Sequence, residues 1–474
     1  MNRSCVVAAI LLAGCAAGPD YVKPASDLPP AWKVEAPWRE SAPGDALAKG
    51  PWWRRFDDTQ LDALQQQAIA NSPTLALAGA RLAQARAALS ATSAGLLPQV
   101  GLNERAARQR ISANRPLSNY NSANFSTVQN DLTLSMSVNY EVDLAGRVQR
   151  SVEGAQALAE QSAADFENTR LLLTADLATA YFNLRAIDTE LDVLQRSIAL
   201  QRRALELVST RHDLGAATGL DVAQQQALLD TTLVQLDVLR RQRGLFEHAV
   251  ATLAGIPAPS FALPADVRER VPPVVPIGVP SDMLERRPDI ASAERAMAAA
   301  NAQIGVASAA FYPSIVLGSA YGVESRALSA LFDAPSLLWS VGVSATQALF
   351  DGGRTRANVE FARAGHAAAA ANYRRVVLGA MQEVEDGITG LAALDRAAAQ
   401  ARTAVAAARR VLDMSTARYE GGASAYLDVI TAQQALLASE RQAAQLLGQR
   451  LLTSVFLVKA LGGDWQPATR RGTS

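Results

Sequence analysis

The stretch LTLSMSVNYEV, residues 132–142, alternates apolar and polar side chains without interruption. Such alternation predicts a β-strand whose two faces meet different surroundings. Its length suits a tilted transmembrane strand, which needs about 9–11 residues. We expect one set to face lipid and the other a water-filled lumen; a soluble sheet with one face on a core is the alternative. The lipid set is Leu132, Leu134, Met136, Val138, Tyr140 and Val142, and the lumen set is Thr133, Ser135, Ser137, Asn139 and Glu141.

The strand lies inside an internal repeat. Pro73–Pro98 and Pro288–Pro313 frame segments of equal length, and RHDLGAATGLDV (211–222) matches RYEGGASAYLDV (418–429). The stretch LLWSVGVSATQAL (337–349) takes the place of the opening strand in the second half. We therefore expect each half to build the same substructure.

Each half is predicted to contain a helix, a β-hairpin, a very long helix, a tight turn and a return helix. Neither Pro116–Pro257 nor Pro335–Pro467 is interrupted by another proline, which favours continuous helix in both spans. Leucine-type residues recur every seven positions in the first long helix, as in a coiled coil. One seam is Leu177, Leu184, Leu191, Ile198 and Leu205, and its companion is Leu173, Ala180, Ile187, Leu194 and Val208. The expected first helices cover about 70–96 and 285–311, the hairpins about 98–143 and 313–350 with loops at 111–130 and 325–336, and the return helices 220–254 and 426–461.

Charge is balanced over the 474 residues, with 45 Lys and Arg against 45 Asp and Glu, so nucleic acid is not expected as a partner. Residues 1–15, MNRSCVVAAILLAGC, read as a secretory signal too short to span a bilayer. Its Leu-Ala-Gly-Cys ending predicts a bacterial lipobox, with Cys15 carrying the N-acyl (palmitate-type) and S-diacylglycerol lipid; an ordinary signal peptide is the alternative. In the lipoproteins that this motif resembles, Asp directly after the Cys favours retention in the inner membrane, so Ala16 at this position favours the outer membrane.

No later stretch is apolar enough for a transmembrane helix, so we expect any membrane crossing to use strands. Four strands cannot close a barrel, and an open edge leaves backbone groups unpaired in lipid. The predicted fold is therefore mainly α with a membrane β-barrel, in which a dimer, trimer or tetramer pools strands and long coiled-coil helices.

Several motifs carry a family resemblance: the lipobox at Cys15, PWWRRFDDTQLDAL (51–64), VPSDMLERRPDIASAE (279–294) and the paired elements at 211–222 and 418–429. With these the chain resembles the TolC-type outer-membrane efflux factors in their lipidated, NodT-like branch. The resemblance implies a homotrimer with a twelve-stranded barrel continuous with a periplasmic helical tunnel. It also implies docking with a periplasmic adaptor protein and an inner-membrane pump, expected to be of the proton-driven RND type.

The predicted organisation follows from the repeat and the resemblance. It comprises a signal peptide (1–14), a lipidated N-terminal arm (15–58), a first repeat (59–254, tip turn 214–220), a Pro-rich linker (255–283), a second repeat (284–461, tip turn 420–426) and a tail (462–474). The expected location is the outer membrane of a Gram-negative bacterium, lipid-anchored and extending into the periplasm.

The resemblance places a gate at the two tip turns. It implies that Asp428 forms a ring of three carboxylates, with Tyr426 and Leu427 beside it, and that Tyr419 bonds to Asp221 to hold the tip shut. The alternative is that Asp221 and Asp428 are first-turn residues of their return helices, where acidic groups favour the helix dipole.

Other chemistry finds little support. Glu285, Arg286, Arg287, Asp289 and Glu294 lie close in sequence but read as a helix start with local ion pairs. His212, His248 and His366 are scattered without metal-ligand spacing, and no phosphate-binding loop is present. We expect neither an enzyme nor a metal or other cofactor. The expected function is an efflux duct for small toxic compounds; a secretion exit channel or a non-transporting lipoprotein are the alternatives.

Overall fold

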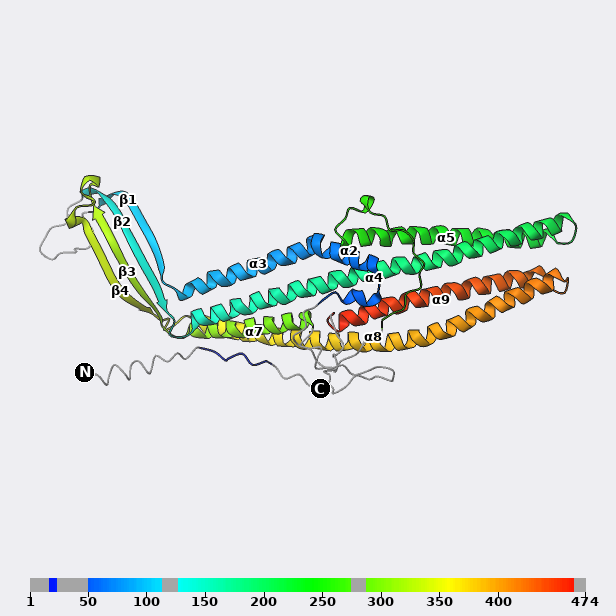
Figure 1. Ribbon diagram of the computed structural model, residues 1–474. Helices are drawn as coiled ribbons and strands as arrows, with labels where there is room; N and C mark the ends of the chain where they lie inside the picture. The colour runs from blue at the N-terminus through cyan, green and yellow to red at the C-terminus, as the bar shows by residue number, and fades with distance from the viewer. Residues whose placement is uncertain (1–16, 24–49, 113–126, 274–286, 464–474) are drawn as a thin grey trace, which may run out of the picture. The chain divides into compact units, whose positions relative to one another are not determined.

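The computed structural model describes residues 17–23, 50–112, 127–273 and 287–463. The predicted signal peptide and the lipid site Cys15 lie outside the described residues. Helices dominate, and the order of the elements repeats along the chain (Figure 1). The first series is α3 (Pro73–Ser93), β1 (Gln99–Ile111), β2 (Thr127–Val142), α4 (Arg147–Asp213) and α5 (Gly219–Leu253). The second is α7 (Pro288–Ala309), β3 (Ser314–Ser325), β4 (Leu337–Thr346), α8 (Arg354–Glu420) and α9 (Tyr426–Ala460).

Equal helix lengths support the repeat. α4 and α8 have 67 residues each, and α5 and α9 have 35 each. At 1.5 Å per residue, 67 residues make a helix on the order of 100 Å long. Shorter elements complete the chain: η1 (Trp52–Phe56), α2 (Thr59–Asn71), η2 (Ala94–Leu96), η3 (Ala258–Ser260), η4 (Leu328–Ala330) and η5 (Ala334–Ser336).

The chain forms two compact units, and each combines residues of both repeats. The strand unit is built from described residues within 1–24, 81–162 and 292–373, and the helical unit from those within 25–80, 163–291 and 374–474. The strand unit holds the sheet, and the helical unit holds the return helices with the turns that precede them.

The strand unit contains one antiparallel sheet with the order β1-β2-β3-β4 (Figure 1). Its register sets Leu102, Met136, Tyr321 and Trp339 side by side in one row. The adjacent row is Gly101, Ser137, Ala320 and Ser340. Because directly paired residues share a face, the apolar face expected for β2 continues over most of β3 and β4. On β1 it is interrupted, because Glu104 pairs with Leu134 and Arg108 with Asn130.

Strand β2 begins earlier than expected. Residues 127–130, which we expected in the connecting loop, belong to the strand, so that boundary is wrong. Asn130 pairs with Arg108 and Val128 with Arg110 on β1. This polar end is held by the backbone ladder to β1, so side-chain alternation gave no signal for it.

The first helix also differs from expectation. A single helix over about 70–96 is wrong, because α2 ends at Asn71 and α3 begins at Pro73. Ser72 between them is extended, with φ −66° and ψ 120°. Proline disfavours helical geometry in the residue before it but is tolerated in the first turn of a helix, so the break follows from Pro73.

The heptad seams are buried as predicted, except that Leu205 is only partly buried. Leu177, Leu184 and Leu194 on α4 are fully buried in the helical unit. Ile187, Leu191 and Ile198 pack with Leu229 and Leu236 of α5 in one apolar cluster. The pairing of the long helix with its return helix therefore rests on this seam.

Candidate functional site

The two tip turns share one backbone geometry. Gly215 and Gly422 have positive φ angles of 76° and 71°. The N–H of Ala216 donates to the Arg211 carbonyl at 2.7 Å, and that of Ala423 to the Arg418 carbonyl at 2.8 Å. Glycine adopts such angles without steric penalty, so both turns close the long helix in the same way.

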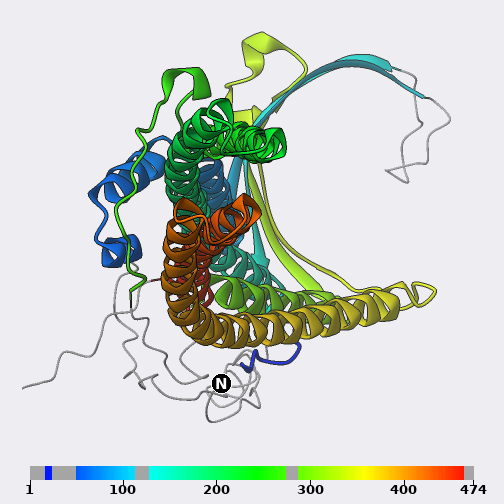
Figure 2. The ribbon, with the colours of Figure 1, turned by 90° about the vertical axis from the view of Figure 1, so that its right-hand side faces the viewer.

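The hairpins that carry these turns pack together. Figure 2 shows the α4–α5 hairpin in green beside the α8–α9 hairpin in orange. One apolar cluster draws on all four helices, with Val208 from α4, Leu228 from α5, Leu412 from α8 and Tyr426 and Val429 from α9. The candidate site is therefore built by both repeats within the helical unit.

Asp221 forms a capping box at the start of α5. Its carboxylate accepts hydrogen bonds from the N–H and the hydroxyl of Thr218, both at 2.9 Å. The Asp221 N–H donates to Thr218 Oγ1 at 3.2 Å. These bonds satisfy backbone donors at the helix start, which agrees with the first-turn alternative for Asp221.

The second turn lacks this cap. Ala425 occupies the N-cap of α9 and has no side-chain acceptor. Asp428 lies in the first turn, where its N–H donates to the Ala425 carbonyl at 3.1 Å. Asp428 and Leu427 are both exposed. Their side chains are thus available at the surface of a single chain, and the three-carboxylate ring stays a prediction.

Tyr419 and Tyr426 lie together, but Tyr419 does not reach Asp221. The two rings have centroids 4.9 Å apart, and the guanidinium of Arg211 lies 4.9 Å from the Tyr419 ring centroid. Tyr419 Oη is buried and makes no hydrogen bond within the described part of the chain. The bond implied between Tyr419 and Asp221 is therefore not formed in this chain.

Tyr426 makes the bond that Tyr419 lacks. Its hydroxyl donates to Gln225 Oε1 at 3.0 Å. Burial, followed by the nearby Tyr419 and Asp221, raises the pKa of Tyr426 above its ordinary value. The hydroxyl therefore stays protonated, as a donor must, throughout the physiological pH range.

Gln225 belongs to a buried glutamine cluster that our sequence interpretation missed. Its Nε2 donates to the Gln201 carbonyl at 3.0 Å and to Gln433 Oε1 at 3.4 Å. All three glutamines are buried. Gln201 stands between Leu194 and Val208 in the companion seam, so a polar residue at an apolar heptad position was the available signal.

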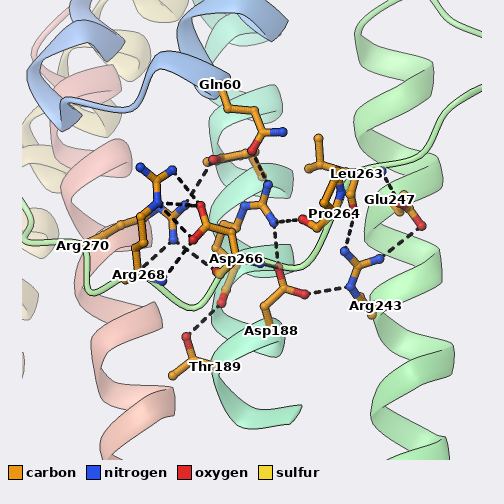
Figure 3. A network of polar contacts seen from close by, with 12 residues as sticks. Gln60, Asp188, Thr189, Arg243, Glu247, Leu263, Pro264, Asp266, Arg268 and Arg270 are labelled. Carbon is orange, nitrogen blue, oxygen red and sulfur yellow. Dashed lines mark hydrogen bonds and ion pairs between the residues drawn. The ribbon is translucent and has the colours of Figure 1, made fainter. Parts of the chain in front are cut away.

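A second buried network fixes the segment that follows α5 (Figure 3). Asp188 of α4 bonds Arg185 and Arg243, each at 2.7 Å, and accepts the Asp266 N–H at 3.1 Å. Arg243 also donates to the Leu263 carbonyl at 2.6 Å. Each charge has an opposite partner and further hydrogen bonds, as buried ions require.

Described residues of the motif VPSDMLERRPDIASAE (279–294) form ion pairs and hydrogen bonds. Arg287 pairs with Asp289 as expected, and also with Glu383 of α8, both at 2.7 Å. It further donates to the Ala460 carbonyl at the end of α9 at 2.8 Å. Arg286 and Glu285 lie outside the described residues. Arg287 thus joins the start of α7 to the middle of α8 and the end of α9.

Glu294, at the end of the same motif, belongs to the strand unit. Its carboxylate accepts from Arg295 at 2.6 Å and from the Tyr21 hydroxyl. Within the described ranges, no group of three His, Cys, Asp or Glu side chains is placed to hold a metal ion. None of the helices in these ranges combines the length and the apolar composition needed to cross a membrane.

Comparison with known families gives one match that covers both repeats. The profile described as outer membrane efflux protein matches residues 64–255 and 279–463. These matches take in α4 and α8, both tip turns and both return helices.

Curated relatives match over nearly the whole chain. The pyoverdine export outer membrane protein OpmQ of Pseudomonas aeruginosa is 31% identical over 98% of this chain and 97% of its own. The toluene efflux pump outer membrane protein TtgF of Pseudomonas putida is 32% identical over 97% and 96%. Among solved structures, the outer-membrane channel OprN superimposes with a TM-score of 0.87 at 29% identity, covering 96% of this chain and 100% of that one.

Proposed function

The chain belongs to the outer membrane efflux protein family, and on this premise we propose that it is the outer-membrane exit channel of a tripartite efflux pump. The observation that carries the proposal is the family match across both repeats. The apolar face of β2, which continues onto β3 and β4, supports it, because such a face suits lipid. The relatives are named for pyoverdine export and toluene efflux, which favours small molecules as cargo.

We propose a homotrimer in which twelve strands close the barrel. β1 and β4 are the edges of the four-stranded sheet in a single chain. Backbone groups at such edges cost several kcal/mol each when they are left unpaired in lipid. Pairing β4 of one chain with β1 of the next would remove the edges, and the trimer number comes from the family resemblance.

The proposed partners are a periplasmic adaptor and an inner-membrane pump of the proton-driven RND type. The chain carries no phosphate-binding loop in its sequence, so a partner would supply the energy for transport. We propose that the chain is a duct rather than an enzyme and that it uses no metal or other cofactor.

We further propose that Cys15 carries the lipid anchor. Contacts of the residues just after it support this. The Ala17 N–H donates to the Ala145 carbonyl at 2.8 Å, and Arg150 Nε donates to the Ala17 carbonyl at 3.3 Å. Ala145 lies between β2 and α4, so an anchor two residues before Ala17 would suit the end of a membrane strand.

Gene deletion with a drug-susceptibility panel tests the transport role. We expect deletion to increase susceptibility to several small toxic compounds and wild-type complementation to restore resistance. Wild-type protein should form heat-modifiable, SDS-resistant trimers in outer-membrane fractions and co-purify with an inner-membrane pump. Unchanged susceptibility to every compound, together with a monomeric chain outside the outer membrane, would contradict the proposal.

A further inference from the structure

Tyr426 occupies a position from which it can control the start of α9. It is the first residue of that helix and immediately precedes Leu427 and Asp428, both exposed. Tyr426 itself is 3% exposed and packs in the cluster shared by the two hairpins. A contact that fixes Tyr426 therefore also fixes the positions of Leu427 and Asp428.

The group that holds Tyr426 is contributed by the other hairpin. Gln225 of α5 is fully buried, and its Oε1 accepts the Tyr426 hydroxyl. Its Nε2 is occupied by the Gln201 carbonyl of α4 and by Gln433 of α9. A single amide therefore joins three helices, and both ends of it are satisfied.

The competing candidate for a tie is weaker. The Asp221 carboxylate is engaged by Thr218, and Tyr419 Oη has no hydrogen-bond partner in the described ranges. The Tyr419 ring contacts Tyr426 and the guanidinium of Arg211. That guanidinium also donates to the backbone carbonyls of Tyr419 and Glu420, each at 3.4 Å. The Tyr419 hydroxyl thus contributes no bond between the hairpins.

We infer that the Tyr426–Gln225 hydrogen bond is a tie between the two hairpins that helps to hold the tip closed, with Tyr426 as the positioning residue for Leu427 and Asp428. The inference rests on the proposed channel function. Movement of the α9 start away from α5 would leave the buried Gln225 amide without its partner, which disfavours that movement. Partners that release the tip would have to offset this loss.

Single-channel recording of purified trimers in planar bilayers tests the tie. Tyr426→Phe keeps the ring in the apolar cluster and removes only the donor. We expect its open-state occupancy to rise by about two- to tenfold, the range for the loss of one neutral hydrogen bond. Tyr419→Phe is the matched control, because it removes a neighbouring tyrosine hydroxyl that has no hydrogen bond, and it should match wild type.

Gln225→Leu removes the acceptor and should also raise open-state occupancy. If the two groups act as one tie, the single changes should not multiply. The open-state occupancy of the double variant Tyr426→Phe/Gln225→Leu should then be close to that of Gln225→Leu alone. Hydrogen exchange of the backbone amides at 426–430 gives a second readout. We expect this exchange to be faster in Tyr426→Phe than in Tyr419→Phe. Both variants should still form SDS-resistant trimers.

The outcomes separate the tie from the channel. A wild-type trimer that conducts, with Tyr426→Phe indistinguishable from it in conductance and exchange, would overturn the tie alone. Equal leakage through Tyr419→Phe would also overturn the tie, because it would assign control to ring packing. If the wild-type trimer and the Gln225→Leu trimer both assemble correctly and neither ever conducts, the proposed channel would be overturned.

Discussion

At the scale of single residues, two carboxylates at equivalent repeat positions differ in their hydrogen bonds because the N-cap residue before them differs. Asp221 and Asp428 both lie in the first turn of a return helix. Thr218 engages Asp221 in a capping box, whereas Ala425 offers Asp428 no side chain to bond. The repeat alone therefore did not determine the role of either carboxylate; the residue three positions earlier did.

This difference predicts the effect of Ala425→Thr. The new hydroxyl should accept the Asp428 N–H, as Thr218 does for Asp221, and stabilise the start of α9 by about 0.5–2 kcal/mol. Ala425→Val has nearly the same shape without a hydroxyl and should give no such gain. Thermal unfolding of the purified protein measures both, and equal midpoints for the two variants would contradict the capping argument.

At the scale of elements, turn-forming residues and the heptad repeat predicted most of the helix boundaries and the buried helix faces. Glycine-containing turns placed α5 and α9 to within one residue of expectation, and the heptads identified the buried seam. The polar start of β2 at residues 127–130 was not predicted, because backbone hydrogen bonds to β1 form it and its side chains do not alternate between apolar and polar. The break at Ser72 could have been predicted from Pro73, whose effect on the preceding residue is local.

The sheet register predicts unequal tolerance of charge at two neighbouring positions of β2. Met136 shares its row with Leu102, Tyr321 and Trp339, so Met136→Lys should lower membrane stability by about 2–4 kcal/mol at mid-bilayer. Ser137, on the opposite face, should accept Lys with little loss. Yield of SDS-resistant trimer from outer membranes measures the difference, and equal yields would mean that the faces are assigned wrongly.

At the scale of the whole chain, sequence predicted the helices and strands but not the long-range polar contacts. The repeat, the seams and the family resemblance led to both hairpins and to the tip turns as the candidate site. They could not reveal that Gln225 would meet Tyr426, or that Asp58 would meet Arg270, because such partners lie about 200 residues apart. Pairings of this kind depend on how helices of different repeats pack, which no local pattern encodes.

Asp58 shows how such a contact fastens distant segments of the helical unit. One carboxylate oxygen caps α2 by accepting the Gln60 and Leu61 N–H groups, each at 3.1 Å. The other accepts the Tyr181 hydroxyl and Arg270 Nε, each at 2.8 Å. Burial opposes ionisation of Asp58, but these hydrogen bonds outweigh it and hold the pKa of Asp58 below its ordinary value.

The lowered pKa predicts acid sensitivity. A carboxylate whose folded pKa lies below its unfolded value stabilises the fold above about pH 4 and loses that contribution as pH falls towards the folded pKa. Asp58→Asn should therefore lower the free energy of unfolding at pH 7 by about 1–3 kcal/mol, with Asp266 still pairing Arg270 at 2.6 Å. The gap between variant and wild type should narrow below pH 4. Asp237→Asn removes an exposed partner of Arg240 and should change stability by less than about 0.5 kcal/mol. Thermal unfolding in detergent from pH 7 to pH 3 measures all three proteins, and a gap that stays constant with pH would show that the ionised carboxylate is not the stabilising form.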